Sequence, residues 1–355
     1  MAALKNQDKK DLKRAREYRG RVLDWYDVHG RDLPWRYKGG VKADPYRVWL
    51  SEIMCQQTTV SAVKPYYAKF LGLWPSVTDL AAAENDAVMA AWAGLGYYAR
   101  ARNLHKCAKV VVEEHGGAFP RTQAALIKLP GIGDYTSAAI AAICFGEAAT
   151  VMDGNIERIM ARFFAIEDAL PKAKPVFKGY TAHFFDNADR AGDLAQGLMD
   201  VGSSICTPKN PKCGRCPLEG GCAGKGIAES LPVKVKAKKR PQKVGEVYWV
   251  INDQGEVLFH RRPDKGLLGG MVALPTSSWA VKDFDVPDFI GDAVRSNHTI
   301  DHVFTHFDLT LHLSFARVDA SPEGYFWALP EDCGEALPSV FKKAYNKFVG
   351  IENLG

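Results

Sequence analysis

The chain has 355 residues, 47% of them hydrophobic and 25% charged, and a formal net charge of +5. This length exceeds one ordinary compact core, so two domains are expected, and the hydrophobic fraction is that of a globular chain. The charged opening, MAALKNQDKKDLKR, contains no apolar signal region, and no apolar run reaches membrane-spanning length. We therefore predict a globular protein of a reducing compartment, whose mild positive charge permits an anionic partner.

Helical patterns follow one another through the first 225 residues. Asp44 and Pro45 suit an N-cap and the first position of a helix, and apolar residues recur after them at helical spacing. Similar patterns, several of them closed by glycines, predict helices over residues 100–115, 122–129, 134–145 and 156–164. This part of the chain is predicted to be all-α.

Three polar residues on the helix after Pro45 recur at i, i+4 and i+7, namely Glu52, Gln56 and Thr59. On one helix they would form a single stripe on the side away from the apolar residues. A solvated helix face and the lining of a cavity mouth both explain such a stripe.

Two glycine-containing turns and one carboxylate stand between the predicted helices. The run GLGYY at 94–98 presents a leucine and an aromatic ring that either pack internally or enter a stack of bases. The run LPGIG at 129–133 leaves bare N–H groups at a helix start, which suits a phosphate, although a ligand-free turn uses glycines for the same steric reason. Asp153 is either a helix N-cap or an anion that stabilises a cation beside bound DNA.

Four cysteines lie within 17 residues, at Cys206, Cys213, Cys216 and Cys222. Zinc, a disulfide or an iron–sulfur cluster could use them, but zinc ribbons usually space two C-x2-C pairs widely, and only one such pair is present. The spacing therefore favours an iron–sulfur cluster. The remaining cysteines are predicted to be small buried hydrophobic residues: Cys55, Cys107, Cys144 and Cys333.

The composition changes after residue 225. Residues 226–243 form a basic linker, either a solvated connector or a strap against phosphates, with positive charges at Lys234, Lys236, Lys238, Lys239, Arg240 and Lys243. Beyond it the period becomes two, as in the alternating run 307–315, and residues 252–255 separate two strands as a hairpin turn would. With an amphipathic helix near its end, this second domain is predicted to be α+β.

Several segments occur together in the order typical of one family: Leu33–Arg36, Ser51–Thr58, Gly94–Arg100, Leu129–Gly133, Asp153–Asn155 and the four-cysteine loop. In these segments the chain resembles the adenine DNA glycosylases of the MutY family, densely over about residues 20–225 and more loosely beyond. The resemblance implies a multidomain protein. A helix-hairpin-helix glycosylase domain would span 1–225, with a six-helix barrel module at about 30–145. An iron–sulfur module would comprise the N-terminal helix and about 146–225, and a Nudix-like domain would span 244–355.

The resemblance also implies the roles of the site residues. Glu52 would be the general acid and Asp153 the carboxylate beside the anomeric carbon, supported by Tyr135 and Asn155. The residues implied to contact DNA or the lesion are Arg31, Trp35, Arg36, Gln56, Gln57, Thr58, Leu95, Tyr97, Gly131 and Gly133. The cysteines would hold a 4Fe-4S cluster. The implied substrate is double-stranded DNA with an A:8-oxoguanine or A:G mispair, bound by a monomer in the bacterial cytoplasm at the nucleoid.

In the C-terminal domain, the run GLLGGM at 266–271 resembles a Nudix fold, but the acidic run that holds Mg²⁺ is missing, so nucleotide hydrolysis is not expected. The family instead recognises 8-oxoguanine through a Phe-Ser-His loop, which corresponds here to Phe304, Thr305 and His306.

Two alternatives remain. In the related endonuclease III branch a lysine at position 135 forms a Schiff base for strand cleavage, which the phenol of Tyr135 cannot do. A non-catalytic, cluster-bearing protein that only marks lesions is the other alternative, and the pair Glu52 and Asp153 argues against it.

Overall fold

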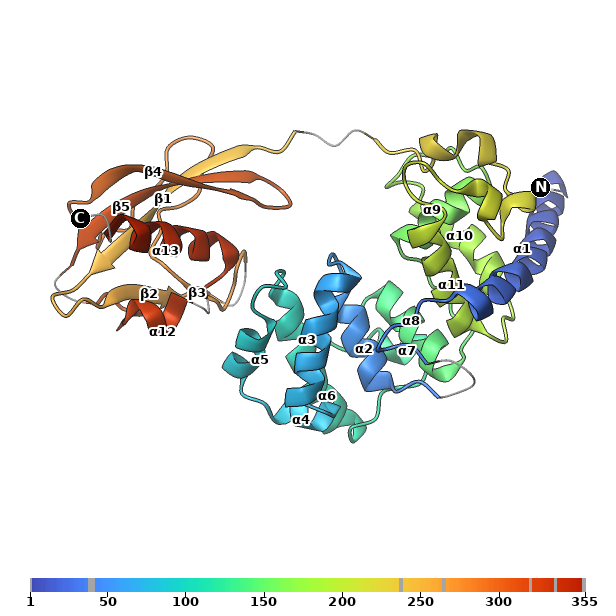
Figure 1. The fold of residues 1–355 in the computed structure, drawn as a ribbon, viewed down its shortest axis with the longest axis horizontal. Helices are drawn as coiled ribbons and strands as arrows, with labels where there is room; N and C mark the ends of the chain where they lie inside the picture. Colours follow the sequence, from blue (N-terminus) through green and yellow to red (C-terminus); the bar gives the residue numbers. More distant parts are fainter. Residues whose placement is uncertain are drawn as a thin grey trace. The chain divides into compact units, whose positions relative to one another are not determined.

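The computed structural model describes residues 2–37, 42–235, 239–263, 266–318, 321–334 and 337–352 (Figure 1). They pack as two compact units, Met1–Ala82 with Asn103–Lys236, and Ala83–Arg102 with Ala237–Gly355. The predicted class, an all-α part followed by an α+β part, is confirmed. Residues 83–102, which the sequence analysis assigned to the helical domain, group with the second unit, and the domain boundaries stay a prediction. Lys236 and Lys238 of the predicted linker lie outside the described residues.

The helices of the first 235 residues vary in length from 4 residues to 28. They are α1 (Ala2–His29), α2 (Pro45–Met54), α3 (Val60–Leu73), α4 (Val77–Ala82), α5 (Asn85–Trp92), α6 (Ala99–His115), α7 (Gln123–Leu126), α8 (Asp134–Phe145), α9 (Gly154–Phe163), α10 (Lys174–Phe185) and α11 (Ala191–Ser204). Short 3₁₀ helices follow at Cys213–Arg215, Glu219–Gly221 and Lys225–Ser230. Within the described residues, no helix combines the length and the apolar character needed to cross a membrane.

The predicted helix ends are set by local chemistry. Asp44 caps α2, its side chain accepting a hydrogen bond from Tyr46 N at 2.9 Å. Gly146 ends α8 with a φ of 71°, which a glycine adopts without strain. The helix predicted over 122–129 is shorter than expected, since α7 comprises only Gln123–Leu126. Pro130 also disfavours helical backbone at Leu129, the residue before it.

The predicted polar stripe on α2 is wrong. The helix ends at Met54, and Gln57 adopts a φ of 56° in the turn that follows. Thr59 caps the next helix, α3, by accepting a hydrogen bond from Ala62 N at 3.4 Å. Glu52 therefore lies on a helix, while Gln56 and Thr59 lie beyond it, because the turn breaks the helical periodicity on which the prediction depended.

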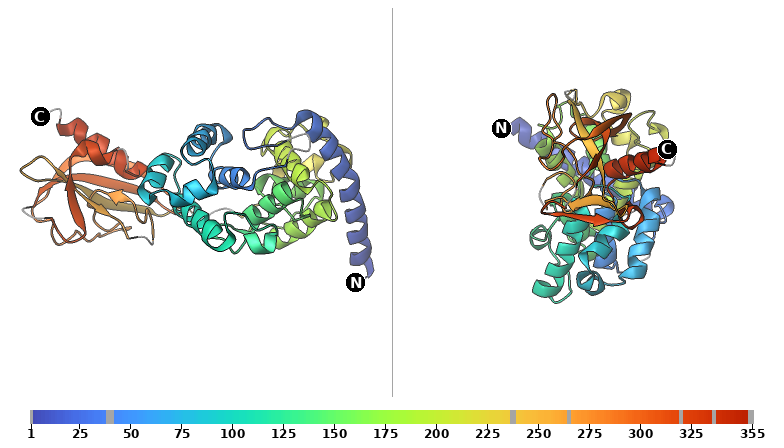
Figure 2. Two further views of the ribbon diagram at one scale, coloured as in Figure 1. Left: turned by 90° about the horizontal axis from the view of Figure 1, so that it is seen from below. Right: turned by 90° about the vertical axis from the view of Figure 1, so that its left-hand side faces the viewer.

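Helix α11 is the centre of the helical unit. It packs against α1, α8 and α9, and α1 runs along the outside of the unit (Figures 1 and 2). A Cβ atom at Gly192 would lie 2.7 Å from the Cα of Ile143 on α8, so only glycine permits this close approach. The approach brings side chains of α11 beside those of α8.

The second unit contains a mixed sheet of order β3-β2-β1-β5-β4, with β6 paired to β2. Its strands are β1 (Gln242–Ile251), β2 (Val257–Arg261), β3 (Val272–Ala273), β4 (Val294–Val303), β5 (Asp308–Arg317) and β6 (Tyr325–Ala328). The predicted hairpin is confirmed, since β1 and β2 are antiparallel neighbours, whereas β1 and β5 run parallel.

Both faces of the sheet are covered. Leu309, Leu311 and Leu313 of β5 pack with Trp249 in a core that includes residues of α13 (Ser339–Glu352). A smaller cluster on other side chains of β1 and β2 contains Tyr248, Val250 and Leu258. A short helix, α12 (Pro330–Gly334), completes the unit. The leucines of the alternating run in β5 are buried as predicted, whereas Phe315 is half-buried and Ser314 is buried too.

Candidate active site

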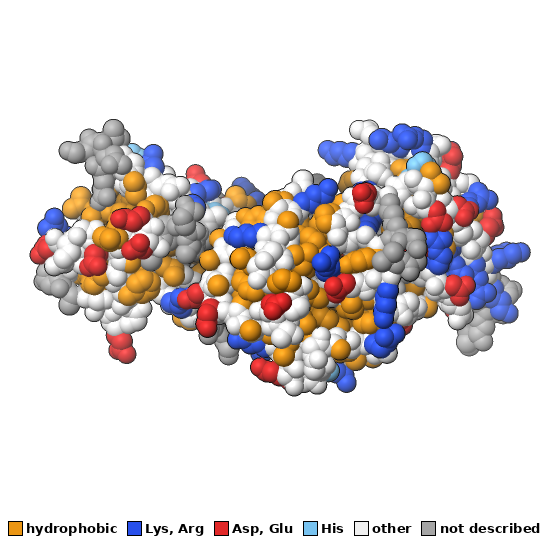
Figure 3. Space-filling view, turned by 60° about the horizontal axis from the view of Figure 1, so that its bottom comes forward, with side chains coloured by type: hydrophobic (Ala, Val, Ile, Leu, Met, Phe, Trp, Pro, Cys, Tyr) orange, Lys and Arg blue, Asp and Glu red, His pale blue; other side chains and the backbone are white. Residues whose placement is uncertain are grey.

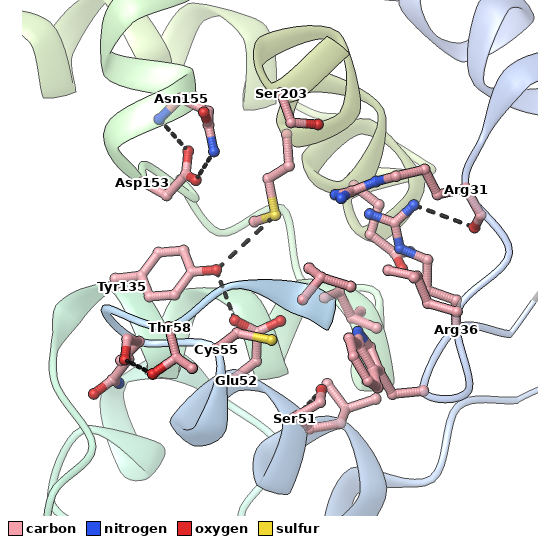
Figure 4. A pocket seen from close by; sticks show the side chains of 18 of the residues that line it. Arg31, Arg36, Ser51, Glu52, Cys55, Thr58, Tyr135, Asp153, Asn155 and Ser203 are labelled. Carbon is pink, nitrogen blue, oxygen red and sulfur yellow. Dashed lines mark hydrogen bonds between the residues drawn. The ribbon is translucent and has the colours of Figure 1, made fainter. Parts of the chain in front are cut away.

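A cavity of about 390 Å³ opens between helices of the first unit (Figure 4). Its lining includes ten residues that the sequence analysis selected, which are Arg31, Trp35, Arg36, Glu52, Gln56, Gln57, Thr58, Tyr135, Asp153 and Asn155. They come from the segment after α1, from α2 and the turn after it, and from the starts of α8 and α9. The fold therefore brings together residues more than 100 positions apart in the chain, while their individual roles stay predictions.

Glu52 and Tyr135 form the first polar contact of the cavity. The phenol oxygen of Tyr135 donates a hydrogen bond to Glu52 Oε2 at 2.6 Å and lies 3.9 Å from the sulfur of Met199. Burial raises the pKa of Glu52, the negative charge of Asp153 raises it further, and the hydrogen bond from Tyr135 and the charge of Arg36 oppose this rise. Burial also holds the pKa of Tyr135 well above its usual value, so the phenol keeps its proton.

Asp153 caps α9 and accepts three hydrogen bonds from N–H donors. Asn155 N and Ile156 N donate to its Oδ1 at 2.9 and 2.7 Å, and the side chain of Asn155 donates to its Oδ2 at 2.8 Å. Asp153 and Glu52 lie on opposite sides of Tyr135 in Figure 4. The N-cap and the active-site interpretations of Asp153 are thus compatible, because the cap bonds orient its carboxylate at the cavity wall.

The side chain of Asn155 is in turn fixed by a hydrogen bond from Arg158. Arg158 donates to Asn155 Oδ1 at 2.9 Å, to the carbonyl of Gly202 at 2.6 Å and to the carbonyl of Cys206 at 2.7 Å. A Cβ atom at Gly202 would lie 2.6 Å from the Cβ of Asn155, so α11 can pass this close only with glycine there. These contacts join the cavity wall to the start of the four-cysteine loop.

Asp200 on α11 is a site residue that the sequence analysis missed. Arg31 Nε donates to it at 2.6 Å and Arg36 Nη2 at 2.8 Å, and its side chain is only 1% exposed. Burial alone would raise the pKa of Asp200, but the hydrogen bond and charge of Arg36, together with Arg31, hold it below its usual value. Asp200 thus fixes both guanidinium groups, which lie across the cavity from Asp153 in Figure 4.

Three residues of α11 that line the cavity also escaped the sequence analysis. Gln196, Met199 and Ser203 recur at i, i+3 and i+7, the spacing of one helix face, and this periodicity is the signal that could have found them. Cys55, predicted to be a buried hydrophobic residue, is half-buried and lines the cavity instead, while Cys107 and Cys144 are buried as predicted. The side chain of Cys333 lies outside the described residues.

Comparison with known proteins now places this cavity in a family. Residues 50–179 match the HhH-GPD superfamily of base excision DNA repair proteins. The chain is 31% identical to the adenine DNA glycosylase of Homo sapiens, an alignment that covers 96% of this chain and 76% of the human protein. It is 34% identical to that of Buchnera aphidicola subsp. Schizaphis graminum (strain Sg), over 82% of this chain and 84% of the relative. The chain belongs to the adenine DNA glycosylase family.

Solved structures share the fold over 60% of the chain. A thermostable thymine-DNA glycosylase aligns with a TM-score of 0.53 and 30% identity, covering 60% of this chain and 96% of its own. A non-covalent endonuclease III–DNA complex aligns with a TM-score of 0.50 and 18% identity over 60% of this chain and 95% of its own, which shows the shared fold alone. The predicted family and the predicted enzyme class, a monofunctional DNA glycosylase, are confirmed.

The four-cysteine loop matches the iron–sulfur binding domain of endonuclease III over residues 206–222. Cys206, Cys213, Cys216 and Cys222 line one pocket and form no disulfide. In the described part of the chain, no group of three or more Cys, His, Asp or Glu side chains is close enough together to hold a single metal ion. Four thiolates around one pocket suit a multi-iron cluster, in which each thiolate binds a different iron. The family match confirms the predicted 4Fe-4S cluster.

The glycine turn at 129–133 lies outside the cavity lining. Gly131 has a φ of 74°, and a Cβ atom there would lie 2.6 Å from the Cβ of Asn103. Both the backbone conformation and the lack of space therefore require glycine. Gly133 precedes α8. The carboxylate of Asp134 is bound by Lys178 Nζ at 2.8 Å, which offsets a negative charge beside this turn.

The loop between α5 and α6 belongs to the second unit. Leu95 is 7% exposed and Tyr97 is 51% exposed, so the tyrosine alone is displayed to solvent. Arg100 donates to the carbonyl of Leu95 at 3.2 Å, and its guanidinium lies 5.5 Å from the centre of the Tyr97 ring. The assignment of both residues to DNA contact stays a prediction.

The C-terminal unit matches the NUDIX domain over residues 246–347. Its predicted recognition loop is a tight turn in which Phe304 N donates to the carbonyl of Phe307 at 2.9 Å. Thr305 and His306 are exposed, while the half-buried ring of Phe304 stacks on Trp279 at 5.7 Å. The loop therefore presents two polar side chains on an aromatic support.

Proposed function

We propose that this chain excises adenine from DNA by protonating the base with Glu52 while Asp153 stabilises the positive charge on the sugar. The observation that carries the proposal is one cavity that contains both a carboxyl group of raised pKa, Glu52, and a carboxylate bound to N–H donors, Asp153. Two carboxyl groups in different environments divide naturally into an acid and an anion.

The reaction requires both groups. Adenine is a poor leaving group as an anion, so its N7 must gain a proton while the glycosidic bond breaks and an oxocarbenium-like sugar forms. A glutamic acid of ordinary pKa is protonated in only about one molecule in 500 at pH 7. Burial, which raises the pKa of Glu52, enlarges the fraction that can donate, and the N–H donors around Asp153 stabilise its negative charge opposite the developing cation.

The flipped base would meet a pre-formed polar frame. Asp200 holds Arg31 and Arg36 in place, so these side chains lose little conformational entropy when the base enters. Trp35 lines the same space and is fixed by an edge-on contact with Tyr67 at 5.1 Å between ring centres. The base must first leave the stack, which costs a few kcal/mol.

We propose as substrate double-stranded DNA that carries adenine opposite 8-oxoguanine or guanine. The relatives are named adenine DNA glycosylases, and exposed Lys209, Lys212 and Arg215 on the cysteine loop suit phosphates. Lys and Arg side chains also gather over the part of the helical unit that carries α1 (Figure 3). Thr305 and His306 would contact the base opposite the adenine. We further propose a monomer in the bacterial cytoplasm at the nucleoid, and the match to the Buchnera protein supports the bacterial setting.

The test is a single-turnover assay on matched duplexes that carry A:8-oxoguanine, A:G or an oxidised pyrimidine. Adenine should be released from the first two without strand cleavage, and the pyrimidine should stay. Release of the oxidised pyrimidine with an intact adenine would assign the chain to the endonuclease III activity instead.

A further inference from the structure

Arg162 on α9 is a buried cation, and each of its three side-chain nitrogens donates a hydrogen bond. Its side chain is among the largest that are fully enclosed, with 2% of the residue exposed. It donates to the carbonyls of Thr207, Pro208 and Leu231 at 2.7, 3.1 and 3.2 Å. Its Nη1 also lies 3.3 Å from the sulfur of Cys206.

None of these acceptors is a carboxylate. Among the described residues, no Asp or Glu side chain forms an ion pair with Arg162, and the acidic side chain of its pocket, Glu219, is bound by Lys225 at 2.6 Å. A guanidinium does not lose its proton in a protein, and a buried charge without a partner of opposite sign is costly. The fold thus keeps a positive charge whose nearest group able to become negative is a cluster thiolate.

The cluster would supply that missing negative charge. Four cysteine thiolates line the pocket that Arg162 faces, and thiolates bind iron in the deprotonated form. Hydrogen bonds to the sulfurs and nearby charges are the means by which proteins set the potential of such a cluster. We infer that Arg162 is the internal counter-charge of the iron–sulfur cluster, favouring its more reduced state and its retention by the protein.

The sign of the effect follows from the charge. Removing one electron makes the cluster less negative, which weakens its attraction to a neighbouring cation. Arg162 therefore opposes oxidation and raises the reduction potential. Exposed Lys209, Lys212 and Arg215 have a weaker influence, because solvent screens their charges.

Arg158 is a matched control on the same helix. It carries the same charge and also bonds to Cys206, but through the carbonyl oxygen and not through the sulfur. It is also less enclosed than Arg162. Arg158→Gln and Arg162→Gln thus remove one charge each, and only the second removes the N–H···S contact.

The experiment is voltammetry of the full-length protein with its cluster, in which the electrode takes up or supplies the electron. For Arg162→Gln the ratio of oxidised to reduced cluster at the wild-type midpoint should rise about tenfold, equivalent to a fall of about 59 mV for one electron. Arg158→Gln should shift this ratio much less. Arg162→Gln should also lose iron faster to a ferrous chelator in air.

Three results would overturn the inference. The first is a wild-type potential with wild-type iron retention in Arg162→Gln, and the second is an equal shift of the potential in both glutamine variants. If Arg162→Gln does not keep its cluster, Arg162→Lys decides, because lysine retains the charge. Arg162→Lys should hold four irons per chain, with a reduction potential between those of wild type and Arg158→Gln. The third overturning result is loss of the cluster from Arg162→Lys as well, because the role of Arg162 would then be packing rather than charge.

Discussion

The cavity of the helical unit and the loop at residues 304–306 hold their polar groups in opposite ways. Glu52 and Asp153 are bound by other protein groups inside a cavity, whereas Thr305 and His306 are displayed to solvent. Burial raises the pKa of a carboxyl group, while a group that contacts a base must be accessible when DNA arrives. Changes in the first region should therefore alter the rate, and changes in the second should alter discrimination.

The largest expected effect is on the chemical step. Glu52→Gln keeps the shape of the side chain but cannot donate a proton, so single-turnover adenine release should fall at least about 100-fold. Binding to the mispaired duplex should persist. Glu147→Gln is the control, because that half-buried carboxylate binds Gln123 N outside the cavity. A Glu52→Gln rate within tenfold of wild type would remove Glu52 from the role of general acid.

Asp200→Asn tests the frame around the cavity. It leaves the guanidinium of Arg36, whose side chain is 5% exposed, without its buried counter-charge, at an expected cost of about 3 kcal/mol in the free energy of unfolding. Asp193→Asn on the same helix breaks an exposed pair with Arg190 and should cost less than about 1 kcal/mol. Denaturant unfolding measures both, and equal costs would show that Asp200 is no more important than a surface residue.

The pair Thr305→Ala with His306→Ala tests the exposed region. Such contacts discriminate between bases by roughly 1–3 kcal/mol, so the preference for A:8-oxoguanine over A:G should fall about tenfold while adenine is still excised. His298→Ala, another exposed histidine of the same unit, is the control. All rates need one salt concentration, because phosphate contacts depend on it. An unchanged preference would mean that this loop does not recognise the lesion.

The smallest expected effect is a shift in pH dependence. Burial raises the pKa of Glu52, and Tyr135 opposes that rise through its hydrogen bond, so Tyr135→Phe should raise the pKa further. A general acid is active when protonated, so the fall in rate at high pH should move to higher pH in this variant. One hydrogen bond corresponds to about 1 kcal/mol, so the rate itself should change only about fivefold. A shift of this limb to lower pH would contradict the assignment of the limb to Glu52.

Part of the active site was accessible from the sequence. Glu52, Tyr135, Asp153 and Asn155 occur in short motifs whose order and residue types resemble one family, and all four line the cavity. Asp200 was not found, because its partners Arg31 and Arg36 are more than 160 positions away in the chain and no local pattern links them. The polar stripe on α2 failed for a local reason, since a turn after Met54 ends the periodicity.

The sequence by itself determined the family, the order of an all-α and an α+β part, and the cysteine loop, because these depend on residue types and spacings along the chain. Only the tertiary structure decided which polar groups are shielded from water and which charges face one another. The pKa of Glu52, the pairing of Asp200 with two arginines and the unpaired charge of Arg162 beside Cys206 are such properties. They arise from the packing of α11 against α1, α8 and α9 and of α2 against α8. Burial and Coulomb energy depend on distance in space rather than on separation in sequence.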